Sequence, residues 1–307
     1  MVELKKIAIT GASGMLGSMI LDVLSSEPDV QLICTVRTEA LADEGRSKYE
    51  NVDWRVLDAR DGSFNDVKKA ISGSSYVINA IGIIKPYVHD DKPEEVERAT
   101  KVNSLFPHSL GRAAAEIDAK VLQIATDCVY SGNKGEYLET DPHDALDVYG
   151  KTKSLGEVFL PNVFNMRCSI IGPEQKNNLS LLEWFLRQPK NARVNGYTNH
   201  SWNGVTTYHY ARMCLGIVKK DTTLPHIQHI VPRDVIQKSE MLQIFAREFN
   251  RSDIQIMPSE AKVPIDRTLL TNNNALNLEL WSGAGYNEPP SIEQMIAKLA
   301  EYMGRKA

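Results

Sequence analysis

Apolar residues follow two alternating spacings through the first half of the chain. Short continuous runs that include valine and isoleucine predict strands, and the apolar residues three or four positions apart between them predict helices. The runs lie at residues 5–10, 31–36, 52–58, 75–82, 120–125 and 165–173. Strands and helices that alternate in this way predict right-handed βαβ crossovers, and therefore a parallel, doubly wound α/β sheet.

The pattern of the second half is less regular. It predicts a strand at 227–232 and helices at 181–186, 239–249 and 291–303, with Ser239 capping the second of these helices. In the first half, residues 93–115 predict a helix that Pro107 kinks or breaks.

These elements divide the chain into two expected parts. We expect residues 1–172 to form a Rossmann-type nucleotide-binding domain. Residues 173–307 would form mainly a smaller C-terminal part that binds a substrate, with some segments returning to the first domain. No long linker or internal repeat separates the two parts, so we expect the site to lie in the cleft between them.

Three glycines follow the first predicted strand at intervals of three residues. Gly11 allows a tight turn, Gly14 lets the backbone approach a pyrophosphate, and Gly17 lets the next helix pack closely on the sheet. Phosphates would bind the free N–H groups at the helix N-terminus, where the helix dipole favours negative charge. The turn therefore predicts a dinucleotide site, and further contacts are expected at Ser13, Met15 and Leu16.

The end of the second predicted strand favours NADP over NAD. Arg37 stands where an acidic residue would hold the ribose 2′-hydroxyl of NAD, whereas an arginine accommodates the 2′-phosphate of NADP. We therefore expect NADPH as the cofactor, with NADH as the alternative.

The ends of the next two predicted strands complete the expected cofactor site. Asp58 ends the third strand, where it either lies near the adenine or caps the following helix. Small residues at the end of the fourth strand would let a ligand approach the backbone. The remaining expected contacts are Ala59, Asn79, Ala80, Ile81, Gly82 and Asn103.

Three residues later in the chain have the chemistry of carbonyl reduction. Tyr149 and Lys153 are four positions apart, so a helix places them on one face. A phenol can donate a proton to a carbonyl oxygen, and a nearby ammonium lowers its pKa from about 10 towards neutral pH. Thr126 follows the fifth predicted strand, and its hydroxyl could orient the carbonyl. The order of these residues after the glycine turn predicts a reductase site.

Taken together, these motifs resemble the extended short-chain dehydrogenase/reductases, and in particular the dTDP-4-dehydrorhamnose reductase branch. The stretches that carry the resemblance are residues 10–17, 79–80, 126–127 and 149–153. The resemblance implies NADPH-dependent reduction of a nucleotide-linked 4-keto-6-deoxysugar in the biosynthesis of sugar nucleotides and surface polysaccharides. Thr126, Tyr149 and Lys153 would be the catalytic residues, and Tyr149 and Lys153 would also contact the cofactor.

The resemblance also leaves two alternatives open. Cys128, two residues after Thr126, resembles a residue of the GDP-fucose synthase branch, which favours an epimerase or an epimerase/reductase. The second alternative is a non-catalytic, NADP-binding regulatory subunit like that of methionine adenosyltransferase. For the assembly state, the hypothesis is a homodimer.

Expected substrate contacts come from both halves of the chain. They are Lys85, Thr126, Asp127, Cys128, Arg167, Asn195 and Trp202, although Arg167 could equally be structural. Arg233 and Lys238 are weaker candidates for contacts with a diphosphate.

Composition narrows the class of protein. The 307 residues carry a net charge of −4, which gives no indication of a nucleic-acid or membrane-surface partner. No apolar run is long enough to span a bilayer, and the first strand begins too early for a leader segment. The four cysteines form no Cys-x-x-Cys pair and His209, His226 and His229 lack metal spacing, so we expect no metal. A reducing, cytoplasmic location is expected.

Overall fold

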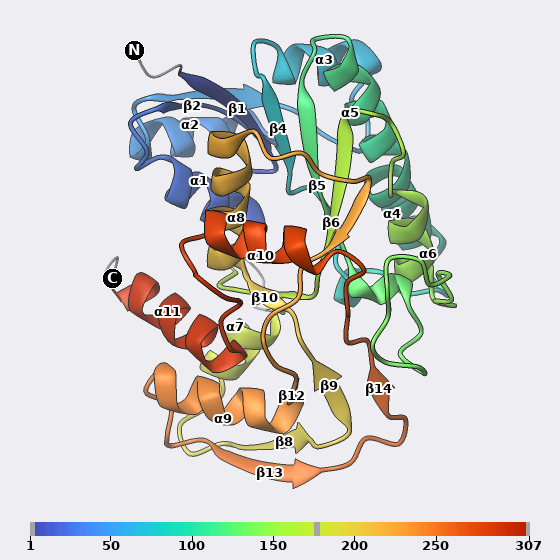
Figure 1. Ribbon diagram of the computed structural model, residues 1–307, viewed down its shortest axis with the longest axis vertical. Helices are drawn as coiled ribbons and strands as arrows, with labels where there is room; N and C mark the ends of the chain where they lie inside the picture. The colour runs from blue at the N-terminus through green and yellow to red at the C-terminus, as the bar shows by residue number, and fades with distance from the viewer. Residues whose placement is uncertain (1–3, 175–178, 305–307) are drawn as a thin grey trace.

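The computed structural model, which describes residues 4–174 and 179–304, is built on a seven-stranded parallel sheet. The strands are β1 (Lys5–Thr10), β2 (Val30–Val36), β3 (Val52–Val56), β4 (Tyr76–Asn79), β5 (Lys120–Ala125), β6 (Val163–Arg167) and β11 (Ile227–His229). Their order is β11-β6-β5-β4-β1-β2-β3, and every neighbouring pair is parallel. The predicted doubly wound α/β fold is therefore confirmed (Figure 1).

Helices cover both faces of this sheet. One face carries α1 (Met15–Leu24), α2 (Glu39–Lys48) and α8 (Thr207–Lys220), with α10 (Asn274–Gly283) packed on α8. The other carries α3 (Phe64–Ile71) and α5 (Phe106–Ala115), with α6 (Val148–Leu155) beside them. Successive strand residues point to opposite faces, so Ile7 and Ile9 enter one core and Ala8 enters the other. Burial on both faces explains the continuous apolar runs of the sequence.

The remaining elements form the lower part of Figure 1. Three small sheets pair β7 (Ile170–Ile171) with β10 (Val205–Thr206), β8 (Arg193–Tyr197) with β13 (Gln255–Ser259), and β9 (His200–Trp202) with both β12 (Ile236–Gln237) and β14 (Ile265–Asp266). The helices of this part are α7 (Leu181–Leu186), α9 (Lys238–Glu248) and α11 (Ile292–Gly304). Since α8, β11 and α10 also come from the second half of the chain, that half contributes to both parts of the molecule.

The helix predicted at 93–115 contains an irregularity of its backbone. It consists of α4 (Pro93–Ala99), a π-helical turn η2 (Thr100–Leu105) and α5. Pro107 has no N–H to donate to the carbonyl of Asn103, which a regular helix would require. The freed carbonyl of Asn103 faces Gly156, where a Cβ would overlap it. Pro107 therefore causes a change of helical pitch and does not break the helix.

Several predicted boundaries and caps were wrong. The strand predicted at 165–173 is interrupted after Arg167 and resumes as β7, which pairs with β10 outside the central sheet. Gln237, not Ser239, is the N-cap of α9, and its backbone N–H donates to Glu240 Oε2 at 2.7 Å. The strand predicted at 227–232 ends at His229. Local pattern does not reveal where a strand leaves its partner, because that depends on neighbours distant in the sequence.

Candidate active site

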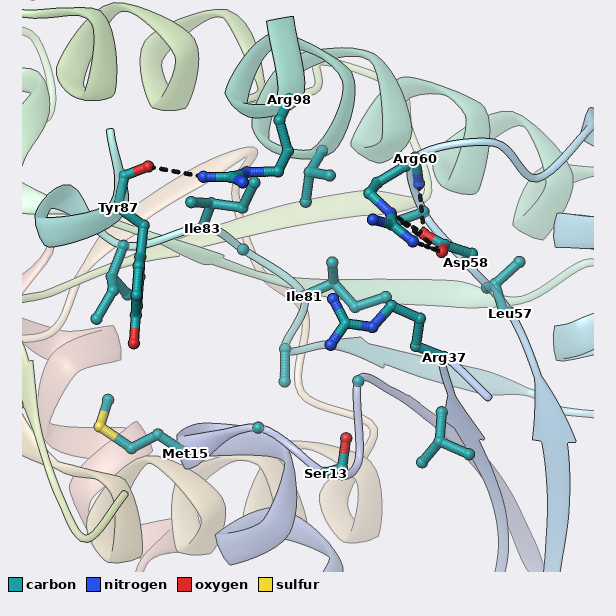
Figure 2. Close-up of a pocket in the computed structure, with 18 of the residues that line it drawn as sticks. Ser13, Met15, Arg37, Leu57, Asp58, Arg60, Ile81, Ile83, Tyr87 and Arg98 are labelled. Atoms are coloured by element: carbon teal, nitrogen blue, oxygen red, sulfur yellow. Dashed lines mark hydrogen bonds and ion pairs between the residues drawn. The ribbon is translucent and has the colours of Figure 1, made fainter. Parts of the chain in front are cut away.

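The glycine turn lines one wall of a cavity of about 460 Å³. Gly11, Ser13, Gly14 and Met15 form this wall, and the exits of β2, β3 and β4 form the opposite side (Figure 2). The cavity thus lies at the carboxyl ends of parallel strands, where the strand order reverses between β1 and β4. This is the place at which doubly wound sheets bind nucleotides.

The turn has the backbone geometry that an anion site requires. Gly11 has a φ of +76°, and the N–H of Gly14 donates to the carbonyl of Gly11 at 3.0 Å. A Cβ at Gly17 would overlap that carbonyl, so α1 can approach the turn only with glycine there. No side chain caps α1, and no acidic residue stands in its first turn. These features leave the helix N-terminus open to a phosphate.

Two of the predicted contacts in this turn lie behind the cavity wall. Leu16 and Gly17 are buried on α1 and are absent from the cavity lining in the described part of the chain. They shape the turn by packing.

A cluster of charge surrounds the far end of the cavity. In Figure 2, the exposed Arg37 lies between Ser13 and Ile81. Asp58 also lines the cavity and binds the Arg60 guanidinium through both carboxylate oxygens, at 2.5–3.0 Å. This hydrogen-bonded ion pair lowers the pKa of Asp58, and the charge of Arg37 adds to the effect.

Arg60 was missed from the sequence because no helix or strand pattern distinguishes it. Its only signal was its position two residues after Asp58, at the same sheet edge as Arg37. The alternative role of Asp58, as a helix cap, was wrong: Ser63 caps α3 through a capping box with Asp66.

Two asparagines predicted to touch the cofactor instead build the cavity wall. Asn79 is buried; it accepts from Thr10 Oγ1 at 2.6 Å and donates to Gln123 Oε1 at 2.7 Å, joining three strands. Asn103 is also buried, and its amide pairs with both backbone groups of Ile83 at 2.8 and 3.0 Å. The backbone that these amides hold, from Ala80 to Ile84, lines the cavity, and so does Ala59.

Arg98 and Tyr87 also line the cavity, and no pattern in the sequence predicted either contact. The Arg98 guanidinium donates to the carbonyl of Tyr87 at 3.1 Å, as Figure 2 shows.

The three predicted catalytic residues lie at the carboxyl edge of the same sheet, although none of them is among the residues that line the cavity. Thr126 directly follows β5, where its hydroxyl accepts from the Cys128 N–H at 3.2 Å. Tyr149 and Lys153 lie on α6, which Asp147 caps. Gly150 allows close approach, because a Cβ there would contact the Cys128 carbonyl. The Asn103 amide also reaches Thr152 on α6 at 3.4 Å, and so links the cavity wall to this helix.

Burial dominates the ionisation of the tyrosine–lysine pair. Desolvation and the nearby Cys128 raise the pKa of Tyr149 well above its usual value, and the Thr126 hydroxyl opposes this rise. Desolvation lowers the pKa of Lys153 to about 8, and Glu157 and Cys128 oppose that change. The Lys153 ammonium donates to the carbonyl of Ile124 at 3.1 Å. In the protein alone, the phenol is therefore protonated at neutral pH.

The second half of the chain brings two cations, Arg267 and Lys238, close to this site. Asp127 is buried next to Thr126; burial raises its pKa, while the charges of Arg267 and Lys238 oppose the rise. Cys128 is a free thiol whose pKa burial raises to about 12. Lys85 pairs with Asp147, the cap of α6, at 2.8 Å. Arg267 was missed because it lies in a segment without periodic pattern.

Three other residues that were predicted to contact the substrate are bonded to neighbouring parts of the protein. Arg167 is completely buried against Glu157. Asn195 lies on β8, exposed and paired with β13, at the lower end of Figure 1. Trp202 is buried and donates its indole N–H to Ser169 Oγ at 2.8 Å, although Lys238 lies 6.0 Å from its ring.

Two further expectations concern metal sites and membrane-spanning segments. His209 and His229 are buried in hydrogen bonds with neighbouring protein groups. Residues 4–174 and 179–304 contain no group of three potential metal ligands. No helix within those ranges has the length and apolarity needed to cross a membrane.

The RmlD substrate binding domain family matches residues 5–304. The chain belongs to this family. A dTDP-4-dehydrorhamnose reductase from Aggregatibacter actinomycetemcomitans is 30% identical over 209 residues, which cover 66% of this chain and 63% of the relative. The beta subunit of methionine adenosyltransferase 2 from Danio rerio is 24% identical, over 96% of this chain and 84% of its own.

Solved structures show the same fold. The dTDP-4-dehydrorhamnose reductase of Bacillus anthracis, in complex with NADP, superposes with a TM-score of 0.73 at 18% identity, covering 97% of this chain and 99% of that one. In sequence, the chain spans less than two thirds of the first reductases that it matches, at 41% and 63% of their length.

Proposed function

We propose that the protein is an NADPH-dependent reductase of a nucleotide-linked 4-keto-6-deoxysugar. The observation that carries this proposal is the placement of Thr126, Tyr149 and Lys153 beside a nucleotide-sized cavity at one edge of the sheet. The reductases among the relatives and the NADP-bound neighbour support it. The division at residue 172, between a nucleotide-binding and a substrate-binding part, is proposed with it.

The residues around the cavity suit the charged groups of NADPH. The uncapped N-terminus of α1 and the close turn at Gly11 would hold the pyrophosphate. Arg37 would hold the 2′-phosphate, since in the described residues it forms no ion pair and it faces the cavity. Asp58 does not oppose a second negative charge there, because Arg60 already neutralises it. When bound, NADPH supplies the hydride that a carbonyl carbon accepts.

The chain's own residues would then control the carbonyl oxygen. Thr126 donates a hydrogen bond that orients this oxygen, and Tyr149 transfers its phenolic proton to it as negative charge develops. Burial of Tyr149 suits this direction of reaction, because its raised pKa keeps the phenol protonated before transfer. Lys153, protonated below a pKa of about 8, would stabilise the phenolate that remains and hold the cofactor ribose.

The substrate would lie between α6 and the cations of the second half. Lys238 and Arg267 face Asp127 beside Thr126, so an anionic substrate finds positive charge on that side. The four cysteines are free thiols, which supports the proposed cytoplasmic location.

The test is oxidation of NADPH with a panel of nucleotide-linked 4-keto-6-deoxysugars, followed by the absorbance of the reduced nicotinamide. We expect turnover with one nucleotide and a preference for NADPH over NADH. Tight NADPH binding without turnover across the panel would contradict the reductase. It would favour a regulatory subunit, which the coverage of the methionine adenosyltransferase beta subunit makes the second candidate.

Replacing Arg37 with alanine tests the cofactor assignment. A charged hydrogen bond is worth roughly 1.5–3 kcal/mol, so we expect NADPH to bind about 10- to 100-fold more weakly while NADH affinity stays unchanged. Arg46→Ala is a matched control, because this arginine pairs with Glu39 and Asp43 outside the cavity. Fluorescence titration with both nucleotides gives the dissociation constants. Equal losses for NADPH and NADH would exclude a 2′-phosphate contact at Arg37.

A further inference from the structure

Arg167 lies at the carboxyl end of β6, beside Ala125, and its side chain is completely buried. Its Nε and Nη2 atoms donate to the two carboxylate oxygens of Glu157 at 3.0 and 2.5 Å. Glu157 is only 5% exposed. The side chains of this ion pair are 0% and 2% exposed, so both charges are buried.

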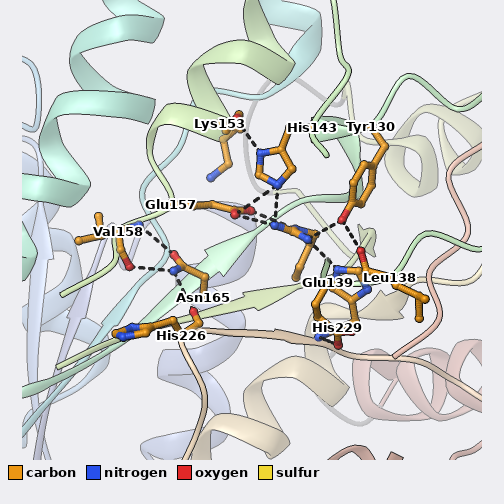
Figure 3. Close-up of polar contacts among 12 residues, drawn as sticks. Tyr130, Leu138, Glu139, His143, Lys153, Glu157, Val158, Asn165, His226 and His229 are labelled. Atoms are coloured by element: carbon orange, nitrogen blue, oxygen red, sulfur yellow. Dashed lines mark hydrogen bonds and ion pairs between the residues drawn. The ribbon is translucent and has the colours of Figure 1, made fainter. Parts of the chain in front are cut away.

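The other donors of Arg167 also have partners. Nη1 donates to the Tyr130 hydroxyl and to His229 Nε2, both at 2.7 Å, and Nη2 donates to His143 Nε2 at 2.8 Å. Each histidine must accept with this nitrogen, so each is neutral. The pKa values agree, because burial lowers both, that of His229 to about 4. Figure 3 shows Tyr130, His143, Glu157 and His229 converging on this point.

These contacts join the segments that carry the proposed catalytic residues. Tyr130 is four residues after Thr126, and Glu157 is four residues after Lys153. His143 adds a contact of 2.6 Å between its Nδ1 and Ser154 Oγ on α6. The network therefore connects the turn after β5, the C-terminal end of α6 and strand β6.

An ion pair in this position is not explained by stability alone. Burying two charges costs several kcal/mol in desolvation, and well-packed apolar residues often stabilise a protein equally well. What Glu157 adds is a carboxylate whose charge raises the pKa of Lys153, and Arg167 fixes the position of that carboxylate.

We propose that Glu157 and Arg167 are a positioning pair, in which Arg167 holds the Glu157 carboxylate behind the Lys153 ammonium and anchors the end of α6 to the strand edge. The proposal deepens the proposed reductase function and rests on it. Neither residue lines the cavity. Glu157 acts on the charge of Lys153, and Arg167 acts by holding Glu157 in place.

The charge balance around Lys153 gives the sign of the expected effect. The titratable groups that face it are Glu157, two residues beyond the end of its own helix, and Cys128, from the turn after β5. Both raise the pKa of Lys153 against the effect of burial. Removing the Glu157 charge therefore lowers that pKa further, and the ammonium is lost at a lower pH.

The decisive variant is Glu157→Gln, which keeps the shape of the side chain and removes its charge. We expect the alkaline limb of kcat to move down by about one pH unit, the usual effect of losing one nearby opposite charge. The KM for the keto sugar should change little, because the Glu157 side chain is buried against Arg167. Glu157→Asp, which keeps the charge, should restore most of the alkaline limb.

A matched control separates this effect from a loss of stability. Arg251→Gln breaks the Arg251–Asp253 pair, which lies outside the cavity and the network of Arg167. It should lower the melting temperature and leave the pH profile unchanged. An unchanged alkaline limb in Glu157→Gln, with only a lower melting temperature, would overturn the proposal. If Glu157→Gln does not fold, Glu157→Asp decides: it must keep the alkaline limb of the wild type.

The pH dependence of NADPH binding separates failure of this proposal from failure of the reductase function. It needs no keto sugar, and the loss of affinity at alkaline pH should also shift to lower pH in Glu157→Gln. A wild-type protein without turnover would refute the reductase, whereas coinciding NADPH binding profiles in wild type and variant would refute the positioning pair.

Discussion

Replacing Tyr149 with phenylalanine is expected to lower kcat about 10²- to 10⁴-fold, which is the usual contribution of a positioned acid or base. The substitution removes only the phenolic oxygen, so the ring keeps its place on α6 beside the Cys128 turn. NADPH should still bind with nearly wild-type affinity, because the glycine turn and Arg37 are untouched. Single-turnover oxidation of bound NADPH, after addition of the keto sugar, measures the chemical step directly.

Tyr197→Phe is the matched control for this experiment. Tyr197 lies on β8, is 39% exposed and does not line the cavity, so its hydroxyl should be dispensable. Turnover of Tyr149→Phe close to that of the control would exclude Tyr149 as the proton donor. The acid would then have to come from another group, and Cys128 would be the next to test.

The second large effect is expected on stability. Arg167→Met leaves the Glu157 carboxylate buried without its counter-ion, and removing one partner of a buried pair costs about 3–5 kcal/mol. The double variant Arg167→Met/Glu157→Gln should recover a large part of this loss, because no uncompensated charge remains. Urea unfolding of the wild type, both single variants and the double variant gives the coupling free energy.

The outcome distinguishes a charge effect from a packing effect. If the double variant is less stable than Arg167→Met by the full cost of the Glu157→Gln change, the two residues do not interact, and the network of Figure 3 does not depend on their charges. Arg251→Gln again provides a reference, since it removes a partly exposed pair at the periphery.

The local sequence did not predict the role of a residue whose neighbours in the fold come from distant segments. From its position within a predicted strand, Arg167 could equally be a substrate contact or a structural residue. Its partners stand 10 to 62 residues away, and only the folded chain brings Glu157 and His229 to it. Asn79 and Asn103 were predicted as cofactor contacts for their place at a strand end and on a helix, but their amides satisfy buried backbone and side-chain groups. A buried amide must find such partners, and the sequence does not show which.

The sequence by itself determined the parallel sheet, the glycine turn and the spacing of Tyr149 and Lys153. Each of these depends on short-range rules: apolar runs for strands buried on both faces, glycine where the backbone has a positive φ or a close neighbour, and four residues for one helical turn. The tertiary structure decided which residues line the cavity, how Arg60 neutralises Asp58, and that Arg267 and Lys238 lie near Asp127. It also set the ionisation of Tyr149 and Lys153, because desolvation depends on everything packed around a group and not on its neighbours in the chain.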